Sequence, residues 1–116
     1  MKALIDGDIF VFGSNLAGRH GKGAALHAKK YYGAIQGVGE GLQGQSYAIP
    51  TKDYLLNTLS LYSISNSIER FISIAEMNLN LNFKITRIGS GLAGYDWNEQ
   101  IRPLFPEKLP TNCEFI

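Results

Sequence analysis

The sequence predicts one α/β domain over residues 1–116, a three-layer α/β/α sandwich around a mixed, mostly parallel sheet. The length of 116 residues fits a single domain. Strand-like and helix-like segments alternate along the chain in the order β-α-β-α-β-α-β. Of the 13 glycines, nine lie between Gly13 and Gly44 and three between Gly89 and Gly94. These two blocks indicate two special loops rather than ordinary turns.

The first elements are a buried strand and a helix. Residues 9–12 read Ile-Phe-Val-Phe, a continuous apolar run typical of a strand buried on both faces. Residues 23–32 predict a helix that ends at Gly33, because small and aromatic residues follow a helical period. Its apolar stripe consists of Ala24, Ala28 and Tyr31, with Ala25 and Tyr32 beside them.

The middle of the chain contains a loop, a strand and the clearest helix. Residues 33–45 are a glycine-rich loop or a hairpin, and both alternatives stay open. Residues 46–49 predict a strand that stops at Pro50. Residues 63–77 predict a helix, because apolar residues recur at i, i+4, i+7, i+8 and i+11. These positions are Ile64, Ile68, Phe71, Ile72 and Ala75.

The last third of the chain predicts a strand, a short helix and a final strand. Residues 83–88 alternate between apolar and polar side chains, as a strand does. Asp96-Trp97-Asn98-Glu99 is a capping-box pattern that opens a short helix, which Pro103 should end. Residues 113–116 predict a last strand. Helices should therefore cover both faces of one sheet.

Charge excludes one class of function and indicates another. Eleven Lys and Arg against ten Asp and Glu argue against a protein that neutralises a nucleic-acid duplex broadly. However, residues 1–32 hold five basic and two acidic side chains, whereas residues 33–116 hold six and eight. This asymmetry predicts a local anion site near the N-terminus.

Cysteine and histidine are too scarce for metal chemistry. Cys113 is the single cysteine, so neither an internal disulfide nor a cysteine metal cluster can form. His20 and His27 are too few for a histidine-dominated zinc site, and both are interpreted as structural. We expect no metal and no cofactor. Without a signal peptide or a membrane span, we expect a cytoplasmic protein with no membrane partner.

The first candidate site is the glycine-rich segment 13–23, which runs from a strand end into a helix start. Free N–H groups at a helix N-terminus favour phosphate, and glycines allow close approach of the backbone. The candidates are Asn15, Gly21, Lys22 and Gly23. Neither a P-loop nor a GxGxxG fingerprint is present. A glycine-rich connection without a ligand is the open alternative.

The second candidate site is the loop between residues 88 and 97, again placed between a strand and a helix. Its candidates are Gly89, Ser90, Gly91, Leu92, Ala93, Gly94 and Tyr95. Two such loops could hold the two phosphates of a dinucleotide-like ligand. Tyr95 or Trp97 could stack on a base, although core packing is the favoured interpretation of both.

Lys52, in Pro50-Thr51-Lys52, follows the predicted strand 46–49. At a strand end its amine could bind a phosphate, act as a desolvated nucleophile or remain in water. Spacing alone favours the solvated lysine. The charged run Arg19, His20 and Lys22 is equally open, because it could steer an anion or lie in a solvated loop.

Taken in order, four segments resemble the macrodomain family, whose members bind ADP-ribose. They are residues 8–15, with an asparagine at the end of a strand; residues 15–30, with Gly-Lys-Gly and paired lysines; residues 50–52; and residues 88–97. The last three are similar to the branch that contains the DNA ADP-ribosyl glycohydrolase antitoxins and the terminal ADP-ribose protein glycohydrolases.

This resemblance implies a ligand and a reaction. Asn15 would orient the distal ribose, backbone N–H groups of residues 21–23 and 89–94 would hold the diphosphate, and Lys52 would be catalytic near the anomeric carbon. The protein would remove ADP-ribose from modified DNA or protein. Alternatively, it would sequester an ADP-ribose-like signalling nucleotide, as a phage protein acting against host defence. Ala93 replaces an aspartate of the protein-directed enzymes, which the DNA-directed ones also lack.

Overall fold

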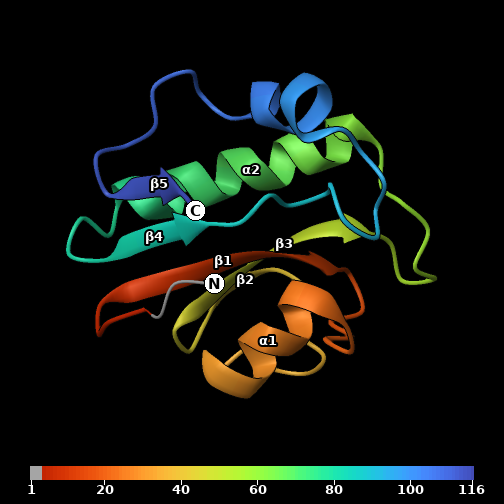
Figure 1. Ribbon diagram of the computed structural model, residues 1–116, viewed down its shortest axis with the longest axis horizontal. Coiled ribbons are helices and arrows are strands. Elements are labelled where there is room, and N and C mark those ends of the chain that lie inside the picture. The colour runs from red at the N-terminus through yellow and green to blue at the C-terminus, as the bar shows by residue number, and fades with distance from the viewer. Residues whose placement is uncertain (1–3) are drawn as a thin grey trace.

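A five-stranded sheet forms the centre of the computed structural model, which describes residues 4–116 (Figure 1). The strand order is β2-β3-β1-β4-β5. The bounds are Asp8–Asn15 for β1, Gly41–Gln43 for β2, Ser46–Lys52 for β3, Asn82–Ile85 for β4 and Cys113–Phe115 for β5. Only the β2–β3 pair is antiparallel, and the other three pairs are parallel. The predicted mixed, mostly parallel sheet is confirmed.

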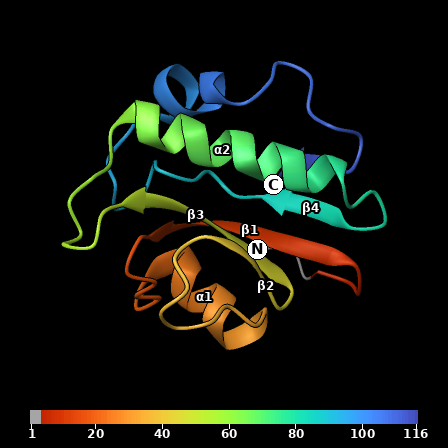
Figure 2. The ribbon, with the colours of Figure 1, turned by 180° about the vertical axis from the view of Figure 1, so that it is seen from behind.

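Helices cover both faces of the sheet, so the predicted three layers are present. Helix α1, Gly23–Tyr31, lies on one face. Helix α2, Leu61–Glu76, lies on the other, together with a π-helical turn η1, Trp97–Ile101, and a 3-10 turn η2, Arg102–Leu104. The view from behind shows the same layering (Figure 2). Within residues 4–116, no helix has the length and apolar character needed to cross a bilayer.

Strand β1 separates two hydrophobic clusters, because its side chains alternate between the faces of the sheet. Ile9 and Val11 join the larger cluster under α2, whereas Phe10 and Phe12 join the smaller one under α1. The expected strand buried on both faces is confirmed. The smaller cluster otherwise consists of alanines, which allow α1 to pack close to the sheet. Its buried alanines are Ala25, Ala28, Ala34 and Ala48.

Several predicted boundaries differ from the structure. The prediction that Pro50 stops the second strand is wrong, because β3 continues to Lys52. Strand β2 pairs with β3 only as far as Ala48. At Pro50 this edge of β3 is therefore not paired with β2, and such an edge tolerates a proline. The predicted strand 83–88 leaves the sheet after Ile85. There the N–H and hydroxyl of Thr86 both donate to Val11 O.

The two main helices agree with their predicted periods but not in every detail. Tyr31, assigned to the buried stripe of α1, is 66% exposed, because the helix buries Ala25 and Ala28 instead. Gly33 follows α1 at φ +73°, as expected of a residue that ends a helix. Helix α2 begins two residues earlier than predicted, where the Ser60 hydroxyl accepts a hydrogen bond from the Ser63 N–H.

The glycine-rich segment 33–45 contains the predicted hairpin alternative, since β2 pairs with β3 across Gly44 and Gln45. At residues 96–99 the Asp96 carboxylate accepts from the Glu99 N–H at 2.8 Å, as the capping pattern predicts. The helix that follows is a π-turn, and Pro103 lies in the next 3-10 turn instead of ending it directly.

The buried Tyr47 hydroxyl is expected to make the unfolding free energy fall at alkaline pH. Burial, followed by the charge of Glu40, raises the pKa of Tyr47 from 10.0 to about 12. This group therefore stabilises the fold fully below pH 10.0, and the contribution is lost as the pH rises through about 12. We expect the unfolding free energy of Tyr47→Phe to fall about 1 kcal/mol less than that of the wild type between pH 8 and pH 11. Urea unfolding at the two pH values measures this difference, and equal losses would contradict it.

Candidate functional site

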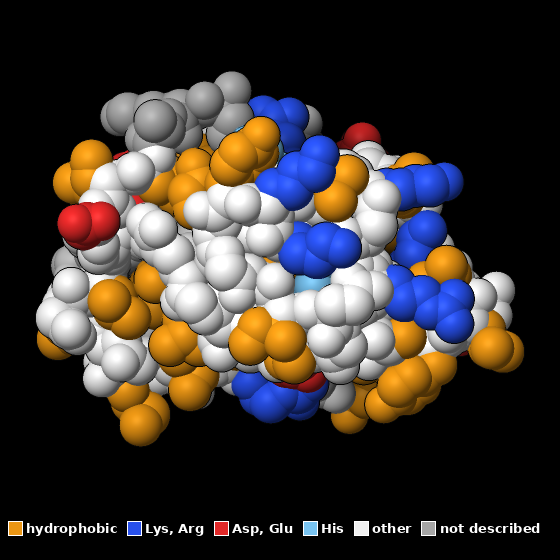
Figure 3. Space-filling model, turned by 90° about the horizontal axis from the view of Figure 1, so that it is seen from below, with side chains coloured by type: hydrophobic (Ala, Val, Ile, Leu, Met, Phe, Trp, Pro, Cys, Tyr) orange, Lys and Arg blue, Asp and Glu red, His pale blue; other side chains and the backbone are white. Residues whose placement is uncertain are grey.

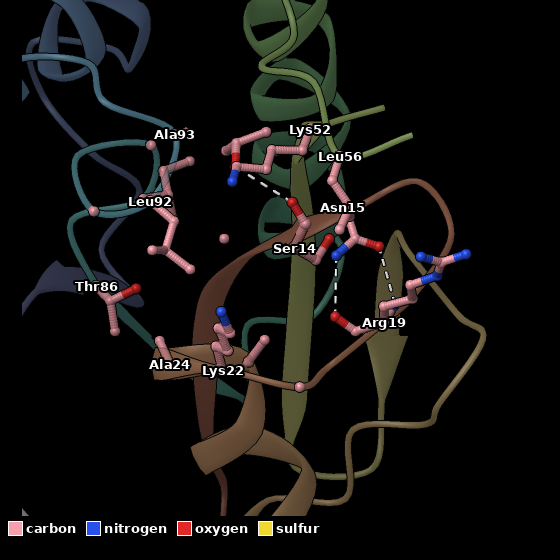
Figure 4. A pocket seen from close by; sticks show the side chains of 18 of the residues that line it. Ser14, Asn15, Arg19, Lys22, Ala24, Lys52, Leu56, Thr86, Leu92 and Ala93 are labelled. Carbon is pink, nitrogen blue, oxygen red and sulfur yellow. Dashed lines mark hydrogen bonds between the residues drawn. The ribbon is translucent and has the colours of Figure 1, made fainter. Parts of the chain in front are cut away.

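A cavity of about 580 Å³ opens at the carboxyl ends of the central parallel strands (Figure 4). It lies where strands feed into the loops of an open α/β sheet, the position at which such sheets bind ligands. The lining residues come from three segments of the chain and one further loop position. They are Gly13–Asn15, Arg19 and Gly21–Ala25; Thr51 and Lys52; Thr86–Gly89 and Gly91–Ala93; and Leu56.

The cavity wall is cationic. Arg19, Lys22, Lys52 and Arg87 line it, and none of the lining residues is acidic. Within residues 4–116 these four side chains form no ion pair. The amines of Lys22 and Lys52 point into the cavity from opposite walls (Figure 4). An anionic ligand would therefore meet two unpaired positive charges, one on each side.

The surface over α1 continues this positive character. Figure 3 shows this face with many Lys and Arg side chains and few acidic ones. Helix α1 itself contains Lys29 and Lys30 and no acidic residue. The basic side chains of α1 therefore lie on this positively charged face, and the anion site predicted from the charge of residues 1–32 stays a prediction. Nowhere within residues 4–116 do three His, Cys, Asp or Glu side chains lie close enough together to hold a metal ion.

A β-bulge brings Asn15 and Lys52 together. Ser14 of β1 pairs with Pro50 of β3, but Asn15 pairs with Lys52, so Thr51 is the extra residue. The Thr51 hydroxyl donates to Ser14 O at 3.3 Å, and Lys52 O accepts from the Leu16 N–H at 2.9 Å. The bulge thus pairs the backbones of Asn15 and Lys52, and both residues line the cavity.

Asn15 also holds the first glycine loop in shape. Its Oδ1 accepts from the Arg19 N–H at 2.9 Å, and its Nδ2 donates to Arg19 O at 3.0 Å. Both bonds are drawn in Figure 4. Two amide hydrogens are present on Nδ2, so one remains for a ligand. The asparagine predicted to contact a ribose therefore first fixes the loop that carries Lys22.

The hairpin segment supports this loop from outside. Gly18 O accepts from the Gly37 N–H at 2.9 Å, and the Ser14 hydroxyl donates to Gly39 O. His20 is fully buried, with Nε2 3.1 Å from Val38 O and its ring edge-on to Phe12. This placement agrees with the structural role expected of His20.

The N-terminus of α1 offers unused donors to the cavity. Lys22 is the N-cap residue, yet no side chain caps the helix and no acidic residue occupies its first turn. The first N–H groups of a helix have no partner inside it, so those of Gly23, Ala24 and Ala25 are available to an anion. The helix dipole adds to the attraction.

The second glycine loop offers donors on the opposite wall. Within residues 4–116 the N–H groups of Gly91, Leu92 and Ala93 donate to no protein atom. The loop is closed around them, because Gly89 O accepts from the Tyr95 N–H at 2.9 Å. Two runs of residues with free backbone donors therefore line the same cavity, from two loops far apart in the sequence.

Most of the predicted site residues meet in this cavity. Nine line it: Asn15, Gly21, Lys22, Gly23, Lys52, Gly89, Gly91, Leu92 and Ala93. Ser90, Gly94 and Tyr95 are not among the lining residues. The Tyr95 hydroxyl donates to Leu59 O at 2.7 Å, and Trp97 packs against Phe105 and Phe115. Both aromatics thus follow the favoured interpretation of core packing rather than base stacking.

Sequence reasoning missed Leu56 and Arg87. Arg87 occupies a polar position in the alternating pattern of the predicted strand 83–88, so nothing distinguishes it from a solvent-exposed strand residue. Leu56 lies in a loop whose conformation no local pattern revealed, and its φ of +67° is unusual for a leucine.

No protein-family model matches this chain, and no curated protein matches it either. A solved structure from Bacteroides thetaiotaomicron, described as a protein of unknown function, is similar over 86% of this chain and 80% of its own length. The TM-score is 0.59 at 19% sequence identity. The similarity concerns the fold alone.

Proposed function

We propose that the cavity binds ADP-ribose or an ADP-ribose derivative through its diphosphate. The observation that carries this proposal is the pair of free N–H runs, residues 23–25 and 91–93, which face one cavity from two walls. Each run suits one phosphate, because convergent backbone donors bind its oxygens without a side chain. The volume of about 580 Å³ lies in the usual range for small-molecule sites.

The positive charges support the same ligand. The diphosphate would lie near Lys22 and the distal ribose near Lys52 on the opposite wall, with no carboxylate in the lining to repel the ligand. Asn15 lies beside Lys52 across the bulge, so a ribose next to the diphosphate would meet both side chains. This arrangement supports the resemblance to macrodomains that the sequence motifs suggest.

For the reaction, we propose that the protein is an ADP-ribosyl glycohydrolase in which Lys52 is the catalytic residue. After the Lys52 ammonium group gives one proton to solvent, its amine forms a bond to the anomeric carbon of the distal ribose, while the bond to the modified target breaks with its electron pair. The amine's released proton neutralises the leaving group. Water then displaces the lysine and yields free ADP-ribose. The targets implied by the resemblance are ADP-ribosylated DNA or protein.

A second candidate function is sequestration of an ADP-ribose-like signalling nucleotide without cleavage. The specific observation in its favour is that no Asp or Glu lines the cavity, so no carboxylate is present to activate water. Ala93 lies in the second loop where a carboxylate would otherwise approach the ligand. Both candidates require the same binding site and differ only in turnover.

Ligand-induced stabilisation tests the binding proposal. We expect ADP-ribose to raise the melting temperature by mass action, whereas AMP or ribose alone at the same concentration produces a far smaller shift. The reason is that only ADP-ribose carries a diphosphate, which can reach both donor runs at once. Thermal scans followed by calorimetry measure the difference. Equal shifts with all three compounds, or no shift with any, would refute the proposal.

A further inference from the structure

Two exposed leucines line the mouth of the cationic cavity. Leu56 is 42% exposed and Leu92 is 71% exposed, yet both belong to the lining. In Figure 4 they lie on opposite sides of the Lys52 amine. Their loops are linked, because the Thr58 hydroxyl donates to Ala93 O at 3.0 Å. Large apolar side chains beside unpaired amines are not explained by diphosphate binding.

The backbone of Leu56 is held in a conformation that leucine disfavours. Its φ of +67° is the left-handed region, and Leu56 is the single non-glycine residue with positive φ within residues 4–116. The Asp53 carboxylate maintains the turn by accepting from the N–H groups of Leu55 and Asn57, both at 2.9 Å. Such strain persists where the surroundings impose it, and it gathers at ligand sites.

We propose that Leu56 and Leu92 form an apolar clamp that holds an uncharged planar ring attached to the distal ribose of the ligand. This inference rests on the proposed function, since it places the ribose beside Lys52. A substituent on the anomeric carbon then lies at the mouth, between the two leucines. There it meets hydrocarbon on both sides and positive charge behind it.

The apolar and positively charged side chains at the cavity mouth favour a planar, uncharged ring. The faces of a planar heterocycle are apolar and its polar atoms lie at the edge, so both leucines can cover it without burying an unpaired donor or acceptor. A cationic group would be repelled by the four Lys and Arg side chains of the lining, with no carboxylate to compensate. The ligand is therefore an ADP-ribose with a neutral ring on its distal ribose.

Reduced nicotinamide adenine dinucleotide is a suitable probe, because it is ADP-ribose with an uncharged ring on the distal ribose. Its oxidised form carries a positive ring, and ADP-ribose carries none. We expect the reduced form to bind the wild type about tenfold more tightly than the oxidised form. In Leu56→Gly, affinity for the reduced form falls about tenfold, whereas affinity for ADP-ribose changes less than twofold.

Stability separates a clamp from a structural role. Glycine adopts the conformation of Leu56 freely, so Leu56→Gly should melt no lower than the wild type while it loses the ring-dependent affinity. Leu56→Asn, which also tolerates positive φ, should behave alike. Leu55→Gly is the matched control, because Leu55 is 82% exposed and does not line the cavity. It should bind every probe as the wild type does.

The outcomes are distinct. Equal losses for the reduced dinucleotide and ADP-ribose in Leu56→Gly, or no loss for either, would overturn the clamp and leave the proposed function in place. Tighter binding of the oxidised form would overturn the neutral ring. If the wild type binds none of the three probes, the proposed function fails, and the clamp fails with it.

Discussion

Replacing Lys52 with alanine is expected to leave ADP-ribose affinity within a few-fold and to lower the rate of ADP-ribose release by about a hundredfold or more. A nucleophile contributes mainly to the reaction, since its new bond exists only after binding. The Lys52 amine points into the cavity beside Asn15 and forms no ion pair within residues 4–116. Single-turnover assays on ADP-ribosylated DNA and protein, together with calorimetry, separate the two effects.

Lys22 provides the matched control for this experiment. Its amine enters the same cavity from the opposite wall, at the N-terminus of α1, where a phosphate is expected. Lys22→Ala should therefore weaken ADP-ribose binding about tenfold, or about 1.4 kcal/mol, with little further loss of turnover at saturation. A wild-type protein that binds ADP-ribose but cleaves no modified substrate would contradict the nucleophile and favour sequestration.

Gly91→Val is expected to abolish ADP-ribose binding while the protein stays folded. A Cβ at Gly91 meets no protein atom within 4 Å, and the backbone there does not have positive φ. The fold therefore tolerates the substitution. The branched side chain would instead occupy the space through which a phosphate approaches the free N–H groups of residues 91–93.

Neighbouring variants make the result interpretable. Gly91→Ala adds only Cβ and should reduce affinity less than valine does. Ser90→Ala changes a residue outside the lining, whose hydroxyl donates to Arg87 O at 2.7 Å, and should retain binding. Circular dichroism and thermal melting confirm folding. Wild-type affinity in a folded Gly91→Val protein would show that this loop only connects β4 to η1.

The elements that the sequence predicted well share a strong local period. In helix α2, the apolar positions from Ile64 to Ala75 follow the helical repeat, and burial of that face on the sheet preserves it. Strand β1 was evident because an uninterrupted apolar run has few alternatives in a small domain. Boundaries were predicted less well, since Pro50 and Thr86 take their roles from neighbouring strands.

The sequence indicates the two glycine loops as candidate sites, but it does not show which of their residues line the cavity and which hold the loop in place. Gly91 and Tyr95 lie four residues apart, and only the folded loop shows that one faces the cavity and the other bonds to Leu59 O. Likewise, Asn15 carried the pattern of a ribose contact, whereas its two bonds to Arg19 became visible only in three dimensions.

From the amino-acid sequence we predict the α/β class, most of the helices and strands, and the two glycine loops that line the cavity. These properties depend on local periodicity and on glycine's freedom, which neighbouring residues specify. The pairing of Asn15 with Lys52, the position of Lys22 on the opposite wall and the place of Leu56 in the cavity lining become visible in the folded protein alone. A bulge and a strained turn create these contacts, and both depend on pairing between segments distant in the chain.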